Sequence, residues 1–440
     1  MFDEYIQGKA LRRLSRFSCS VGFLIEGYQA GVLGGVQETK PFLNAIGNPT
    51  GTETIPMIAS SYTLAAAFMS CVVMLIGMPL GRRRCIIIGN AFIAIGGVIQ
   101  ATSYSVPQII VARVLCRMPI AFQSLFAILS GVSMVFLPDT PRWYYARDNI
   151  PEGDKTLSRI YGVYRNGTTN HSTVPEIQAM KQNIMENFHV EEESDNRLTL
   201  LSLIWDTTPL RVGRRVRISF LILAIQQSMG INMLVYYMTL IFTNVGLSDF
   251  LASLLAAISL TVQWVGSLLC VVTIERIGRR RIMMWTACIE TCCMLIFVVL
   301  NTLQDKTVST QWAAAMIMFP YMFFYGWGWV GCPWLYGPEI APLRYRHIGS
   351  AAGLLGVWLF TFLTVFAGGI AFETVGPKIW IWPLIFNAIA FLFVYFMCPD
   401  PTNKTLEEVD ALFAKDEAIL NRLNHLVDEK PTAQEIEKAT

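Results

Sequence analysis

Long apolar runs recur along almost the whole chain, and each is about the ~20 residues that a helix needs to cross a bilayer. The 440 residues are 53% hydrophobic and only 15% charged, whereas soluble proteins carry about 25% charged residues. A chain with so many apolar side chains cannot bury them all in a protein core, so many of them must face lipid. We therefore predict an all-α polytopic membrane protein with about ten spans. The expected spans lie near 17–36, 57–80, 85–104, 107–137, 217–243, 250–274, 282–303, 312–337, 348–372 and 380–398.

The polar stretches divide the chain into five parts. We expect a tail at 1–16, a helical half at 17–137, a central polar loop at 138–216, a six-helix half at 217–398 and a tail at 399–440. Clusters of arginine at 12–16, 82–84, 276–281 and 344–346 fall on one side of the membrane if both tails are cytosolic. The positive-inside rule favours that orientation. The sequons at Asn166, Asn170 and Asn403 then face the cytosol and should carry no glycan.

Several classes of function lack a motif in this sequence. The ten cysteines lie mostly in or beside apolar runs and the four histidines are scattered, so neither a disulfide framework nor a metal site is indicated. Gly326, Gly328 and Gly331 spell GxGxxG, but no strand precedes them, and glycines in a span more often allow close helix packing. We expect no enzyme activity, no cofactor and no bound metal. The net charge of +2 gives no reason to expect nucleic acid as a partner.

Polar side chains interrupt one apolar run at bilayer depth. Residues 217–243 include Gln226, Gln227, Asn232, Tyr236 and Tyr237. Amides are costly there unless they face a partner or a watery cavity. They could bond the hydroxyls of a polyhydroxylated solute, because an amide both donates and accepts hydrogen bonds. They could equally join neighbouring helices. On a straight helix they would not all share one face, so gathering them requires a bend or break near Gly230.

The chain contains two related halves of unequal length. GRRR at 81–84 recurs at 278–281, and the Pro-Asp pair at 138–139 recurs at 399–400. The interval between the two motifs is about 60 residues longer in the second half, enough for two spans with their loops. A repeat of this kind is typical of transporters that hold their substrate between two halves.

The sequence resembles the sugar porter family of the major facilitator superfamily, especially its fungal members. The motifs that carry the resemblance are GYQAGVLGG (27–35), GRRR (81–84), LPDTPRW (137–143), QQSMGIN (226–232), ERIGRRR (275–281), PWLYGPEIAPLRYR (333–346) and PDPTNKTLEEVD (399–410). The resemblance implies a twelve-span fold, of which most of span four and all of span five are missing between Cys116 and Arg117.

The resemblance also implies a binding site. The sugar would be held by Gln226, Gln227, Asn232, Gln263 and Trp334. Amides suit the hydroxyls and an indole suits the apolar face of a sugar ring, although Gln263 could also serve helix packing. The adjacent pair Tyr236 and Tyr237 would act as a gate. Where the family has an amide in span eleven, this chain has Val357.

A cytosolic latch is a further implication of the resemblance. Glu275, Arg279 and Arg280 would pair with Glu339, Arg344 and Arg346 while the outside is open, with Arg82 and Arg83 in the corresponding motif of the first half. That motif is incomplete, because Met78 stands where the family has an acid.

Proton coupling requires a carboxylate that titrates at membrane depth. Proton-linked family members have Asp where this chain has Gln29, which favours facilitated diffusion. Glu26, one helical turn earlier, with Arg113 as its partner, is the alternative.

We therefore expect a monomeric sugar carrier in the plasma membrane that works by alternating access, with the lipid bilayer and a sugar, and in the coupled alternative protons, as its partners. The alternatives are a transport-inactive variant, a sugar sensor, or a carrier of polyols or quinate-like acids.

Overall fold

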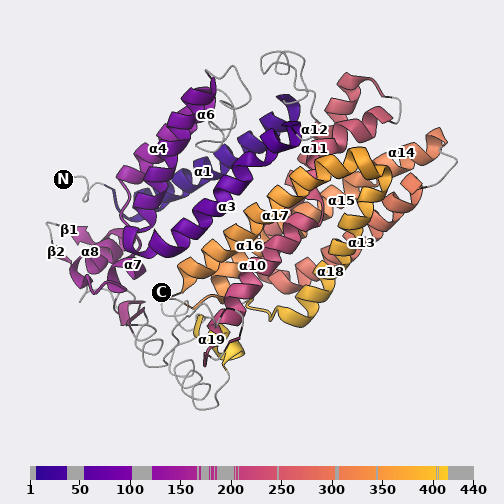
Figure 1. The fold of residues 1–440 in the computed structure, drawn as a ribbon. Helices are drawn as coiled ribbons and strands as arrows, with labels where there is room; N and C mark the ends of the chain where they lie inside the picture. The colour runs from indigo at the N-terminus through magenta and orange to yellow at the C-terminus, as the bar shows by residue number, and fades with distance from the viewer. Residues whose placement is uncertain are drawn as a thin grey trace. The chain divides into compact units, whose positions relative to one another are not determined.

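The computed structural model describes most of the chain. Its described residues are 6–36, 54–101, 121–165, 168–169, 178, 180–182, 184–185, 203, 205–206, 208–244, 247–302, 307–342, 345–402, 404 and 406–414. They fall into two compact units, residues 1–190 and 191–440, which are considered separately below. Helices dominate both units (Figure 1), as the prediction of an all-α protein requires. The pair β1 (Tyr164–Arg165) and β2 (Thr168–Thr169) is the only strand pairing in the described part of the chain.

The first unit consists of long apolar helices and a short polar extension. The long helices are α1 (Gly8–Val36), α3 (Thr54–Leu80), α4 (Arg82–Ala101) and α6 (Ala121–Val135), and the extension holds α7 (Pro141–Tyr145) and α8 (Ile150–Tyr161). Helix α6 packs against both α1 and α4. Between α4 and α6 the buried Asn90 amide donates a hydrogen bond to the Ser130 hydroxyl at 3.1 Å. This bond satisfies polar groups in an otherwise apolar contact.

The second unit contains the remaining long helices. They are α10 (Val212–Ser228), α11 (Ile231–Asn244), α12 (Asp249–Ile277), α13 (Arg279–Thr302), α17 (Arg346–Val375) and α18 (Ile381–Met397), together with the broken series α14 (Val308–Met316), α15 (Met318–Tyr325), the π-helix η3 (Gly326–Val330) and α16 (Cys332–Ile340). The turn η4 (Gly376–Trp380) precedes α18, and α19 (Leu406–Phe413) follows it.

Most helix boundaries lie within a few residues of the expected spans, but the expected span at 107–137 is described only as α6, and that at 312–337 is divided into α14, α15, η3 and α16. Six of the described helices are long and apolar enough to cross a membrane. Many large apolar side chains on them are exposed, among them Leu75, Phe250 and Val271, as expected for surfaces that face lipid. Helix α1 begins at Gly8 rather than near 17, so the basic residues of the N-terminal tail lie on its first turns. The gap expected between Cys116 and Arg117 lies outside the described residues.

Helix α10 lies at the centre of the second unit, whereas α12 lies at its edge. In their apolar windows 78% of the residues are buried for the α10 segment, and 17% for α12. Helix α10 packs most extensively against α17, and α13 against α18. The amides at 226 and 227 are therefore carried by the most enclosed of the candidate spans.

Candidate functional site

The apolar run at 217–243 is broken in its middle, as gathering its amides requires. Gly230 has φ +100° and separates α10 from α11. Two features exclude a side chain at position 230. The positive φ favours glycine, and an added Cβ would lie 2.6 Å from Cγ of Pro383. Discontinuous helices of this kind form the substrate sites of many transporters.

The peptide groups at the break are satisfied by side chains from neighbouring helices. The Met229 carbonyl accepts hydrogen bonds from the Tyr321 hydroxyl at 2.7 Å and from the Asn387 amide at 3.1 Å. The Gln226 carbonyl accepts one from the Tyr325 hydroxyl at 3.2 Å. Because lipid offers no hydrogen bonds, these contacts are what makes a break in a span tolerable.

Three of the predicted sugar ligands meet at the break. The Asn232 amide donates to Oε1 of Gln227 at 2.8 Å, and the Gln227 amide donates to Oε1 of Gln226 at 3.3 Å. The Gln226 amide donates to the carbonyl of Trp329 on η3. The hydroxyl of Thr361 on α17 also donates to Gln227, at 3.2 Å. We call Gln226, Gln227, Asn232 and Thr361 the amide cluster.

The members of the amide cluster differ in their contacts and in their burial. Gln226 is almost fully buried and joins α10 to η3, which is the helix-joining role. Asn232 is only half-buried, so its amide is the member most open to a ligand. Thr361 had not been expected in this group. Its place one turn after Val357 on α17 is the signal that could have suggested it.

The two other expected sugar ligands, Gln263 and Trp334, belong to different helices from the members of the amide cluster. Gln263 is half-buried on α12, and Trp334 is half-buried on α16, where it packs against the apolar core. An added Cβ at Gly326 would collide with the backbone carbonyl of Gln263, and one at Gly328 would collide with the Thr286 hydroxyl. The GxGxxG segment is therefore a close helix crossing, as the sequence had indicated.

The repeated motifs form matching contacts in the two units. Gly81 (φ +85°) and Gly278 (φ +98°) each begin a GRRR segment. In the first unit Arg83 donates from its backbone to Asp139 at 2.9 Å, and from its side chain to the carbonyl of Val135 at 2.6 Å.

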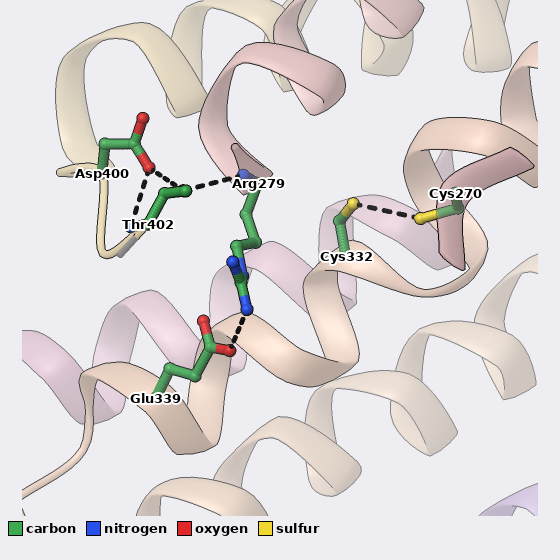
Figure 2. A network of polar contacts seen from close by, with 6 residues as sticks. All are labelled: Cys270, Arg279, Cys332, Glu339, Asp400 and Thr402. Carbon is green, nitrogen blue, oxygen red and sulfur yellow. Dashed lines mark hydrogen bonds and ion pairs between the residues drawn. The ribbon is translucent and has the colours of Figure 1, made fainter. Parts of the chain in front are cut away.

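In the second unit the backbone of Arg279 donates to Thr402 at 3.3 Å, and Thr402 donates to Asp400 at 2.5 Å (Figure 2). The side chain of Arg280 donates to the carbonyl of Tyr395 at 2.6 Å. In both units, therefore, a GRRR segment is bound to the end of the last long helix and to the Pro-Asp motif after it. This correspondence confirms the internal repeat.

One of the expected charge pairs forms in the second unit. Arg279 and Glu339 form an ion pair at 3.0 Å (Figure 2). Arg346 lies close enough to Glu339 for its charge to act on that carboxyl. Glu275 is exposed on the last turn of α12, and Arg82 is exposed on the first turn of α4. Arg344 lies outside the described residues.

The coupling and gating candidates are only partly placed. Glu26 and Gln29 belong to α1, and Tyr236 and Tyr237 belong to α11, but the structure does not describe their side chains. Arg113 lies outside the described residues altogether.

Two adjoining cavities lie where the first unit's GRRR segment meets α7 and α8. They have volumes of about 450 and 430 Å³ and share Arg83 and Tyr144 in their walls. Burial, followed by the nearby Asp139 carboxylate, raises the pKa of Tyr144. Among the residues that the structure describes, no group of three or more His, Cys, Asp or Glu is arranged to hold a metal.

Comparison with known proteins identifies the family. The sequence profile described as "Sugar (and other) transporter" matches residues 16–120 and 116–413. The chain therefore belongs to this family, which is a branch of the major facilitator superfamily. It is a multi-pass membrane transporter by family and is not an enzyme.

Individual relatives agree with this assignment. The chain is 27% identical to the MFS-type transporter oryC of Aspergillus oryzae, over 92% of this chain and 85% of that protein. It is 29% identical to the high glucose sensor RGT2 of Saccharomyces cerevisiae, over 74% of this chain and 43% of that protein. The structure is similar to that of the proton:xylose symporter XylE bound to 6-bromo-6-deoxy-D-glucose, with a TM-score of 0.77, 17% identity, and coverage of 92% of this chain and 100% of that one.

The family match divides where the sequence predicts a missing segment. Its two parts meet at residues 116–120. The alignment with the Aspergillus oryzae protein extends over 475 positions, more than the 440 residues of this chain, so it contains gaps in this chain.

Proposed function

We propose that the protein carries a hexose or a related carbohydrate across a membrane by alternating access, and that it does so by facilitated diffusion. The observation that supports this most directly is the amide cluster at the break between α10 and α11. It brings Gln226, Gln227 and Asn232 together in the centre of the second unit. Family membership supports a sugar as the substrate.

The sugar would be bound by the exposed side of the amide cluster. Asn232 would hydrogen-bond the sugar hydroxyls, Gln263 would add a second amide, and Trp334 would pack against the ring. Gln226 would not donate to the sugar, because its amide already donates to the Trp329 carbonyl on η3. Its Oε1 would instead hold the Gln227 amide in place. Tyr236 and Tyr237, one helical turn after Asn232 on α11, would form the gate.

The ion pair between Arg279 and Glu339 would belong to the latch that holds the cytosolic side closed. Both side chains are partly exposed, so the pair can open at little cost in free energy. Arg280, Arg344, Arg346, Glu275, Arg82 and Arg83 would complete the latch.

Facilitated diffusion follows from Gln29, which cannot carry a proton where proton-linked relatives have Asp. The test is uptake of radiolabelled hexose into vesicles containing the purified chain, with and without an imposed pH gradient. We expect saturable uptake that reaches the external concentration and no more. Accumulation above it, driven by the gradient and lost in Glu26→Gln, would establish coupling through Glu26 instead.

A transport-inactive form is the second candidate, and the division of the family match at 116–120 favours it. The test is to amplify the transcript across the codons for Arg113 to Pro119. A single short product supports the chain as described. A second product, longer by about two spans of coding sequence, would assign transport to the longer protein. The relation to a glucose sensor adds sensing to the alternatives, and the family also admits polyols and other solutes.

For the location, we propose the plasma membrane, with both termini in the cytosol and the protein acting as a monomer.

A further inference from the structure

The ten expected spans contain only two acidic residues, Glu26 and Glu290. Glu290 lies in the middle of α13 and is fully buried. Neither of its carboxyl oxygens has a hydrogen-bond partner among the described residues. A negative charge at such a position is very unfavourable, whereas a protonated and neutral carboxyl is tolerated.

Among the described residues, two tyrosine hydroxyls and a thiol lie near Glu290. Tyr321 and Tyr325 on α15 and Cys293 on α13 lie close enough for the charge of Glu290 to act on them. The Asn387 side chain of α18 is a hydrogen-bonding neighbour of Tyr321. The elements packed on α13 carry further titratable groups in their described parts, namely Asp249, Cys270, Glu275, Arg276, Cys332, Tyr336, Glu339, Lys378 and Tyr395. The charge of none of these groups acts on the Glu290 carboxyl.

The same two tyrosines connect Glu290 to the amide cluster. Their hydroxyls donate to the carbonyls of Met229 and Gln226, which border the helix break. A hydroxyl has one proton to donate. If Glu290 were ionised, its carboxylate would compete for these protons, because charge-assisted hydrogen bonds are about twice as strong as neutral ones.

We propose that Glu290 is a proton-binding site that regulates sugar binding at the amide cluster. With the proton bound, the tyrosine hydroxyls hold the two carbonyls, and Gln226 and Gln227 are kept in their present arrangement. When the proton leaves to water, the hydroxyls turn to the carboxylate. The Gln226 carbonyl then loses its tyrosine partner, and the Met229 carbonyl keeps only the Asn387 amide. The inference rests on the proposed sugar site, and it assigns to the proton a regulatory role that requires no net proton transport.

The protonation state can be measured without any sugar. Infrared difference spectroscopy of the purified protein, titrated with acid and alkali, separates the carbonyl band of a carboxylic acid from the bands of a carboxylate. We expect an acid band at neutral pH that Glu290→Gln removes and Glu26→Gln leaves in place. Absence of such a band in the wild-type protein, or its survival in Glu290→Gln, would overturn the proposal.

The link to the amide cluster is measured by sugar binding as a function of pH. With the proton and the sugar linked, affinity should be constant at low pH and fall by up to about tenfold per pH unit where the proton is lost. Glu290→Gln, which resembles the neutral acid in shape, should bind with the low-pH affinity throughout. Glu290→Met, an apolar chain of similar length, serves the same purpose if the glutamine variant does not fold.

The outcomes separate the two proposals. If no sugar binds at any pH but the infrared band behaves as expected, the proposal of a sugar carrier is wrong. The linkage between proton binding and sugar binding is then also wrong, whereas the proton site at Glu290 is supported. If sugar binds with the same pH dependence in wild-type and Glu290→Gln, or if only Glu26→Gln removes that dependence, the regulatory role of Glu290 is wrong.

Discussion

The substitution Asp410→Asn should destabilise the second unit substantially. Arg215 is fully buried near the start of α10, and its guanidinium pairs with the carboxylate of Asp410 on α19. The same guanidinium donates to the carbonyls of Ile340 and Asp410, both at 3.2 Å, and lies 4.4 Å from the centre of the Phe413 ring. The neutral amide would leave the buried positive charge without its counter-ion.

The expected magnitude follows from these contacts. Removing one partner of a buried ion pair costs about 3–5 kcal/mol. The two carbonyls and the aromatic ring remain, so we expect the lower end, about 3 kcal/mol. For a unit of this size, each kcal/mol lowers Tm by about 2–4 °C, so the expected decrease is about 6–12 °C.

The assay is thermal denaturation of the detergent-solubilised protein. The fraction of protein that remains monodisperse is measured at each temperature and gives Tm. Leu412→Ala is a control on the same helix, because that side chain is exposed, and it should leave Tm nearly unchanged. The double variant Arg215→Met with Asp410→Leu should recover most of the loss, since apolar replacement of a buried pair is often neutral. An unchanged Tm in Asp410→Asn would refute the reasoning and show that α19 is not anchored through Arg215.

The remaining predictions concern the proposed transport cycle. Gln227→Leu removes the acceptor at the centre of the amide cluster and should weaken sugar binding about five- to tenfold, for a loss of about 1–1.5 kcal/mol; equilibrium binding measures it. Gly326→Ala places a Cβ against the backbone carbonyl of Gln263 and should cost about 1–3 kcal/mol of stability, read as a lower Tm. Glu339→Gln breaks the ion pair with Arg279 and should shift the equilibrium toward the state open to the cytosol by up to about fivefold, because partly exposed pairs contribute about 0–1 kcal/mol; labelling of a cytosolic reporter cysteine follows the shift.

Each of these three predictions has an outcome that contradicts it. Unchanged sugar affinity in Gln227→Leu would leave the amide cluster with a helix-joining role only. For the glycine, Gly89→Ala is the matched control, since nothing lies within 4 Å of an added Cβ there; equal stability of the two variants would disprove the close crossing. Equal labelling of Glu339→Gln and the wild-type protein would show that the ion pair is not part of a latch.

The spans were predictable because the bilayer allows so few solutions. A segment within lipid must satisfy its own peptide groups, so an apolar run of sufficient length becomes a helix. The break at Gly230 was also foreseeable, because the amides of Gln227 and Asn232 could not otherwise have met. The motif repeat was readable from the sequence, and the contacts of Arg83 and Arg280 with the ends of the last long helices give it a physical meaning.

Long-range partners were beyond the reach of the sequence. Arg215 and Asp410 are 195 positions apart, and no periodicity connects residues at that separation. Thr361 was missed for the same reason, since its hydroxyl reaches Gln227 from another helix. Glu290 was visible as an acid within a span, but its burial without a partner depends on which way α13 turns in the packed unit. The roles of the predicted ligands, gate and latch remain proposals.

The central claim is that this chain carries sugar through a site built on the amide cluster. Counterflow tests it most directly: vesicles containing the purified 440-residue chain are loaded with unlabelled glucose and diluted into a trace of labelled glucose. We predict a transient accumulation of label that is absent from empty vesicles and much reduced in Gln227→Leu. A well-folded protein that gives no counterflow with glucose or with any other hexose would contradict the account.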